Sequence, residues 1–173
     1  PKISFLEIEI DDEISSYKSY LEDFFSKLGN NKTNFFTDIS NYISYERGLP
    51  THCFDRESIT QGFAFINRSC EENFKTLLGD EIELQGKNCV FTIGEEVISI
   101  AGVMGGDSTA CSSNTKKVLV ECAYFNPEEI IGKTIKYNLK SEAAYKFERG
   151  VDISLQETVL RRFISIVQDH AQI

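Results

Sequence analysis

Residues 88–103, NCVFTIGEEVISIAGV, decide the fold class, because they contain two short apolar segments rich in β-branched residues. Segments of the same kind, broken by turn signals, occupy residues 62–67, 74–78, 81–84 and 117–125. Leu78-Gly79-Asp80 and Gln85-Gly86-Lys87 are typical of hairpin turns. The middle of the chain is therefore predicted to form a mixed or antiparallel β-sheet.

Helices are predicted on both sides of this block, and residues 3–10 alternate between apolar and acidic like a strand. Apolar residues at helical spacing or capping signals predict helices over residues 12–28, 36–47, 126–139, 141–149 and from 154 onward. The expected class is α+β, with helices flanking a central mixed or antiparallel β-sheet or sandwich core. One domain of residues 1–173 is expected, as a fragment of a longer subunit.

The net charge of the chain is acidic. Lys and Arg number 18 against 27 Asp and Glu, which gives −9 at pH 7. An acidic chain repels a phosphate backbone, so free-standing nucleic-acid binding is not expected unless a local basic patch or a larger assembly supplies positive charge. Residues 133–149 form a locally positive stretch, with five basic and two acidic residues. Such a stretch is usually a solvated helix face, although it can also meet phosphate.

The cysteines and histidines predict no metal site. The five cysteines are widely spaced without a CxxC pair, and the histidines are His52 and His170. Reduced thiols in a cytoplasmic protein are expected. The most apolar stretch, residues 97–104, is shorter than the roughly 18 residues of a membrane-spanning helix. No signal peptide is visible, and the chain opens on Pro1, as expected for a segment of a longer cytoplasmic protein.

A Walker A loop, GxGxxG, GxSxG and HExxH are absent from the sequence. Besides the positive stretch, three local features are candidates for chemistry. Ala101-Gly102-Val103-Met104-Gly105-Gly106 follows an apolar strand and is either a tight turn or a pocket wall of backbone. Glu121 interrupts the apolar run VLVECAYF, so it needs either a cation such as Arg149 or a ligand. His52, after Pro50, is either a loop hydrogen-bonding residue or a general base.

Together these features resemble one family. The segments DISNYISYERGLPTHCFD (38–55), ISIAGVMGGDS (98–108), VECAYFNP (120–127) and SEAAYKFERGVD (141–152) are similar to the B3/B4 domain of the bacterial phenylalanyl-tRNA synthetase beta subunit. They follow the family's order and approximate spacing over residues 35–170. The resemblance implies an editing domain that hydrolyses tyrosine wrongly esterified to the phenylalanine tRNA, without the aminoacylation site.

The resemblance also implies roles for individual residues. His52 corresponds to the histidine associated with editing catalysis, and Glu121 to the glutamate that reads the tyrosine hydroxyl. The other substrate-binding positions that it implies are Asn41, Gly102, Gly105, Ser141 and Ala143. Ser141 stands where the family usually has threonine, and serine keeps the hydroxyl but lacks the methyl group. The hydrolysis would use a positioned water, with backbone amides of residues 102–106 stabilising the oxyanion.

The partners implied are the phenylalanine tRNA, tyrosine as the editing ligand, and the synthetase alpha subunit in a heterotetramer. No cofactor, metal or membrane is implied for this domain, whereas ATP and magnesium are expected for the whole synthetase. The alternatives are a non-catalytic tRNA-binding or scaffold module of the same synthetase and a free-standing domain that binds aromatic amino acids. A tyrosine-sized pocket joining Glu121 to the glycine loop would favour editing.

Overall fold

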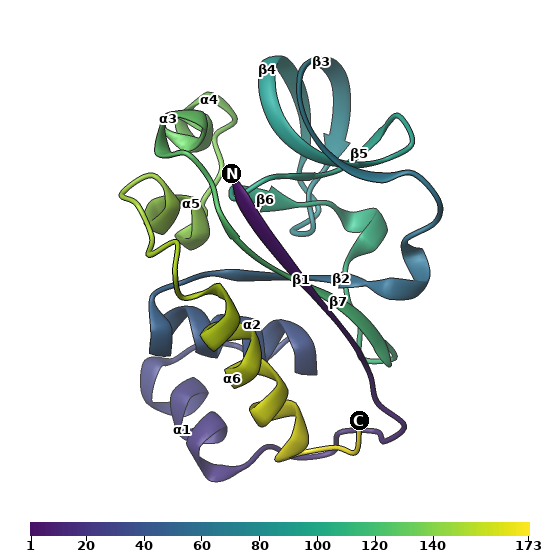
Figure 1. Cartoon of the computed structure of the whole chain (residues 1–173), viewed down its shortest axis with the longest axis vertical. Helices are drawn as coiled ribbons and strands as arrows, with labels where there is room; N and C mark the ends of the chain where they lie inside the picture. Colours follow the sequence, from purple (N-terminus) through teal and green to yellow (C-terminus); the bar gives the residue numbers. More distant parts are fainter. The chain divides into compact units, whose positions relative to one another are not determined.

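The strands of the computed structural model, which describes residues 1–173, form two separate sheets. A three-stranded sheet has the order β1-β7-β2, and a four-stranded sheet has the order β3-β4-β5-β6. The helices precede, interrupt and follow these strands (Figure 1). The α+β class expected from the sequence is confirmed, with the strands divided between two sheets.

The chain folds into two compact units. The first, here called the helix unit, comprises residues Ile3–Arg56, Cys111–Ala123 and Asp152–Ile173. The second, here called the strand unit, comprises residues Pro1–Lys2, Glu57–Ala110 and Tyr124–Val151.

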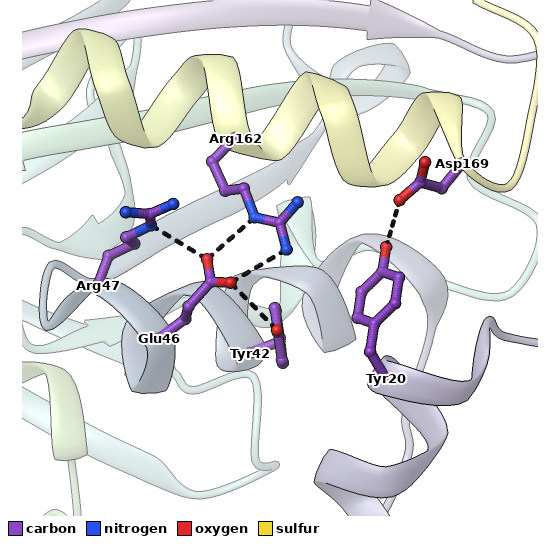
Figure 2. A network of polar contacts seen from close by, with 6 residues as sticks. All are labelled: Tyr20, Tyr42, Glu46, Arg47, Arg162 and Asp169. Atoms are coloured by element: carbon purple, nitrogen blue, oxygen red, sulfur yellow. Dashed lines mark hydrogen bonds and ion pairs between the residues drawn. The ribbon is translucent and has the colours of Figure 1, made fainter.

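The helix unit contains the three-stranded sheet and the three longer helices. Its elements are β1 (Lys2–Glu9), α1 (Ser19–Leu28), α2 (Phe35–Arg47), β2 (Thr51–Asp55), β7 (Lys117–Tyr124) and α6 (Gln156–Gln168). Strand β7 is central, which explains why it is apolar on both faces: Val118, Val120, Cys122 and Ala123 are fully buried. Helix α2 packs against both α1 and α6, and an ion-pair network joins α2 to α6 (Figure 2).

Helices α1 and α2 both end where the sequence predicts, but α1 begins later than predicted. Both helices end at a glycine in the left-handed conformation, Gly29 with φ 67° and Gly48 with φ 72°. Helix α1 begins at Ser19 instead of Asp12. Residues before it are held by tertiary contacts instead, because Tyr17 donates to the Asp38 carboxylate at 2.7 Å. The apolar residues therefore keep helical spacing before Ser19, although the helix itself begins there.

The start of α6 also differs from the prediction. Its N-cap is Leu155, and no side chain caps it. The hydroxyl of Ser154, predicted as the cap, donates instead to Asp152 Oδ1 at 2.6 Å. The Ser154 hydroxyl is therefore engaged by Asp152 and does not cap the helix.

The strand unit is built around a long hairpin. Its strands are β3 (Phe63–Lys75), β4 (Glu81–Ile93), β5 (Glu96–Ile100) and β6 (Met104–Gly105). The predicted turn at residues 78–80 is confirmed, but Gly86 lies inside β4, opposite Cys70, so the second predicted turn was wrong. Gly86 has φ 64°, and the hairpin pairing continues through it. The glycine at this position therefore gives the strand a locally irregular backbone and does not end it.

Short helices complete the strand unit. They are the 3-10 helices η1 (Arg56–Ser58) and η2 (Asp107–Thr109) and the α-helices α3 (Pro127–Ile130), α4 (Lys133–Lys136) and α5 (Glu142–Phe147). The single helix predicted over residues 126–139 is split, because Gly132 between α3 and α4 has φ 81°. Asn126 and Ser141 cap α3 and α5 with their side chains.

Candidate functional site

The pairing of β2 with β7 places His52 directly opposite Glu121. The two strands are antiparallel (Figure 1). Helix α2 ends at Gly48, and the buried residues Leu49 and Pro50 lead straight into β2. The helix end and the strand register together bring these two predicted residues side by side.

Both side chains point from the same face of the sheet, because residues directly opposite each other share a face. On β2, His52 shares that face with Phe54, and the two rings meet edge to face with centroids 4.4 Å apart. The other face is turned to α2, where Cys53 Sγ donates to the Phe36 carbonyl at 3.5 Å. Phe54 is thus a neighbour of the candidate site that sequence reasoning missed and that the two-residue strand period indicates.

The environment of Glu121 is apolar. The residue is 4% exposed, and burial alone raises the pKa of its carboxyl group to about 8. No hydrogen bond or ion pair engages its carboxyl group. Arg149, considered as its partner from the sequence, instead pairs with Glu148 at 2.6 Å and lies over the Tyr145 ring.

Burial shifts the pKa of His52 in the opposite direction. His52 is half-buried, and desolvation lowers the pKa of its imidazole to about 4. Both shifts favour the neutral forms of these groups at pH 7, a carboxylic acid beside an imidazole. Each of these groups offers one hydrogen-bond donor and at least one acceptor. Because buried polar groups without a partner cost about 1–3 kcal/mol each, this arrangement suits a polar ligand group such as a hydroxyl.

Asn41 belongs to the same unit but lies apart from this pair. It is on α2, and its side chain is exposed. The preceding residue, Ser40, is the one that reaches β2, where its hydroxyl donates to the Thr51 carbonyl at 2.6 Å. The structure does not join Asn41 to His52 or Glu121 by a hydrogen bond.

The other predicted residues, Gly102, Gly105, Ser141 and Ala143, belong to the strand unit. Gly102 lies in the turn between β5 and β6 with φ 70°. A Cβ atom there would lie 2.7 Å from the Phe125 ring and 3.0 Å from Ile130, so only glycine fits.

Ser141 ties helix α5 to this turn. Its hydroxyl donates to the Val103 carbonyl at 2.6 Å and accepts from the Ala144 amide at 3.0 Å. The hydroxyl thus caps the helix and fixes the turn at the same time, which explains why serine serves at a position where threonine is expected. Ala143, in the first turn of α5, is half-buried.

The amides of the glycine turn are partly engaged. Val103 N donates to the Ile100 carbonyl at 2.9 Å, and Gly106 N donates to the Ile98 carbonyl at 2.8 Å. Gly105 is buried in β6 opposite Ser99, and its carbonyl accepts from Leu77 N. Val103 and Gly106 are therefore not available as oxyanion donors, contrary to the expectation for the whole stretch.

Two clefts of the molecule lie outside the predicted site residues. Clefts of about 440 Å³ in the helix unit and about 290 Å³ in the strand unit are lined by none of the predicted site residues. No cluster of three or more His, Cys, Asp or Glu side chains is placed to hold a metal ion. None of the helices has the length and apolar character needed to cross a membrane.

Curated proteins with similar sequences are beta subunits of one ligase. The chain is 38% identical over 143 residues to the phenylalanine–tRNA ligase beta subunit of Burkholderia pseudomallei (strain 1710b), covering 83% of this chain and 18% of that protein. It is 37% identical over 125 residues to the same subunit of Vibrio cholerae, covering 72% and 16%. The chain thus spans less than a fifth of the length of these relatives.

A solved structure and a family model also match. The structure is an N-terminal fragment of the phenylalanyl-tRNA synthetase beta-subunit from Pyrococcus horikoshii, with a TM-score of 0.49 and 12% identity, covering 87% of this chain and 46% of that one. The family model is described as the B3/4 domain and matches residues 10–172. Because this model covers nearly the whole chain, the resemblance of the quoted sequence segments is confirmed, and the chain belongs to the B3/4 domain family.

Proposed function

We propose that this chain is the editing domain of a phenylalanine–tRNA ligase beta subunit. It hydrolyses the ester of tyrosine wrongly attached to the phenylalanine tRNA, and Glu121 reads the tyrosine hydroxyl. Membership of the B3/4 family supports the context. The observation that carries the proposal is the buried Glu121 carboxyl, which has no partner and lies opposite His52.

The physical reason for such a site is the small difference between the two amino acids. Phenylalanine and tyrosine differ by one hydroxyl, and an apolar pocket rejects an added hydroxyl only weakly. A site that hydrogen-bonds the hydroxyl rejects the analogue that lacks it much more strongly, by about 10⁴-fold or more in favourable cases. Glu121 supplies that hydrogen bond, and phenylalanine would leave the carboxyl group unpaired.

His52 positions the reacting groups in this proposal. A base whose pKa is near 4 holds a proton weakly at neutral pH, so it drives proton abstraction poorly. The neutral imidazole instead orients the attacking water or the terminal ribose through a hydrogen bond. The proposal keeps Asn41, Gly102, Gly105, Ser141 and Ala143 as further substrate-binding positions. Within the strand unit, Ser141 fixes the turn that contains Gly102.

The proposal also includes the setting of the reaction. The chain acts in the cytoplasm, within a longer beta subunit that pairs with the alpha subunit in a heterotetramer. The alpha subunit holds the ATP and magnesium that charging requires. Editing by this chain uses a water molecule and no cofactor.

Removal of the Glu121 carboxyl group tests the proposal. In the intact ligase, Glu121→Ala should lower the preference for Tyr-tRNA over Phe-tRNA in deacylation by about tenfold, because one hydrogen bond to the tyrosine hydroxyl is lost. Glu83→Ala, at an exposed position in β4, is the matched control and should leave the preference unchanged. An unchanged preference in a folded Glu121→Ala enzyme would refute the assignment.

Filling the pocket gives a second test. Ala143→Trp should abolish deacylation of Tyr-tRNA and leave the charging of phenylalanine unchanged, because charging takes place on the alpha subunit. Normal deacylation by this variant would remove Ala143 from the site. If the unmodified ligase itself lacks deacylase activity, a non-catalytic tRNA-binding or scaffold role replaces the editing proposal.

A further inference from the structure

The β2–β7 pair brings the buried carboxyl group of Glu121 beside the half-buried imidazole of His52, and neither group has a counter-charge. His52 and Glu121 are register partners on antiparallel strands, so their side chains leave the sheet on the same face. The Phe54 ring lies 4.4 Å from the imidazole, centroid to centroid. Neither the imidazole nor the carboxyl group takes part in a hydrogen bond or an ion pair.

The groups that surround Glu121 offer no positive charge. The titratable groups next to it are His52 across the strand pair and the thiols of Cys53 and Cys122. Burial raises the pKa of both thiols, so they are neutral at physiological pH. An ionised carboxylate here would be an unpaired buried charge, which proteins avoid by keeping the group protonated.

We infer that Glu121 recognises the ligand hydroxyl as a neutral carboxylic acid, with the neutral imidazole of His52 beside it on the same face of the sheet. This inference rests on the proposed function and deepens it. A carboxylate could only accept a hydrogen bond, whereas a carboxylic acid also donates one. The site therefore selects a neutral ring substituent that both donates and accepts, which is the chemistry of a phenolic hydroxyl. Binding of tyrosine then needs no release of a proton.

The glutamine variant separates the two protonation states, because an amide resembles a carboxylic acid in having both a donor and an acceptor. The probes are tyrosyl- and phenylalanyl-adenosine joined by a non-hydrolysable amide, titrated into the intact protein that contains this chain. We expect Glu121→Gln to lower the tyrosine-over-phenylalanine affinity ratio by no more than about threefold, and Glu121→Ala by about tenfold. Glu83→Gln is the matched control, with an unchanged ratio.

The number of protons exchanged gives an independent measurement. Calorimetric titration of the tyrosyl probe at pH 7 in two buffers of different ionisation enthalpy should show no net proton release. The affinity of the unmodified protein should fall above about pH 8, where the acid is lost, and the affinity of Glu121→Gln should not.

Two results would overturn the inference. Release of about one proton on binding, with affinity rising between pH 6 and 8, means that the carboxylate is the binding form, and the proposed function then stands without the inference. Equal affinity ratios in the unmodified protein, Glu121→Gln and Glu121→Ala would instead overturn the reading of the hydroxyl by Glu121, and with it the proposed function.

Discussion

The junction of α2 with α6 and the strand pair β2–β7 lie in the same unit and each contains a glutamate, but the surroundings of the two carboxyl groups are opposite. At the junction, Arg162 binds both oxygens of Glu46, with Nε–Oε2 and Nη2–Oε1 distances of 3.0 Å. Arg47 adds an ion pair, and the Tyr42 hydroxyl donates to the same carboxylate (Figure 2). In the strand pair, Glu121 has no such partner.

The pKa shifts follow from these surroundings. Although burial raises the pKa of Glu46, the hydrogen bonds and charge of Arg162 outweigh burial and hold it below its usual value. Burial acts unopposed on Glu121 and raises its pKa to about 8. A carboxylate whose oxygens are all engaged stabilises the fold, whereas a buried carboxyl group without a partner is available to a ligand. This difference supports a structural role for Glu46 and the proposed ligand-reading role for Glu121.

The largest expected effect is the dependence of stability on pH at Glu121. Its pKa rises from 4.5 in the unfolded chain to about 8 in the fold. Because the folded value is the higher one, its contribution is fully present below pH 4.5 and is lost as the pH rises through 8. The loss is up to about 5 kcal/mol, at about 1.4 kcal/mol per pKa unit.

Urea unfolding of the unmodified protein and of Glu121→Gln at several pH values measures this loss. Between pH 5 and 8.5 the free energy of unfolding of the unmodified protein should fall relative to that of Glu121→Gln. A constant difference would mean that Glu121 ionises freely in the fold, as Glu46 does, and the comparison would fail.

A smaller effect of opposite sign is expected at His52. Its pKa falls from 6.5 to about 4, so its contribution to stability is present above pH 6.5 and is lost as the pH falls through 4. The loss is up to about 3 kcal/mol. His52→Gln should remove this acid sensitivity, as measured by thermal unfolding between pH 7 and 4. Parallel acid curves for the two proteins would contradict a lowered pKa of the His52 imidazole in the fold.

The smallest effect concerns the junction of α2 with α6. Arg162→Ala should lower the free energy of unfolding by about 1–2 kcal/mol, because it leaves Glu46 without its two-point partner. The neighbouring Arg161 is the matched control, since its pair with Glu157 is exposed on both sides. Arg161→Ala should cost less than about 0.5 kcal/mol. Equal losses in denaturant titrations would show that the junction contributes no more than an exposed ion pair.

The sequence by itself determined the features that depend on neighbours in the chain. The apolar run of β7 marked a strand buried on both faces, and it made Glu121 anomalous without any knowledge of the fold. Gly48 marked the end of α2, and Asn126 supplied the cap of α3. These signals are local because they arise from backbone conformation and from hydrogen bonds that span a few residues.

Only the tertiary structure decided how distant residues meet. The register that places His52 opposite Glu121 joins segments far apart in the chain, and the pair Glu46–Arg162 spans 116 residues. Tertiary pairing also carried β4 through Gly86, where the local composition predicted a turn. The physical reason is that strand register and side-chain partners are chosen by burial and packing between segments, which no local pattern encodes.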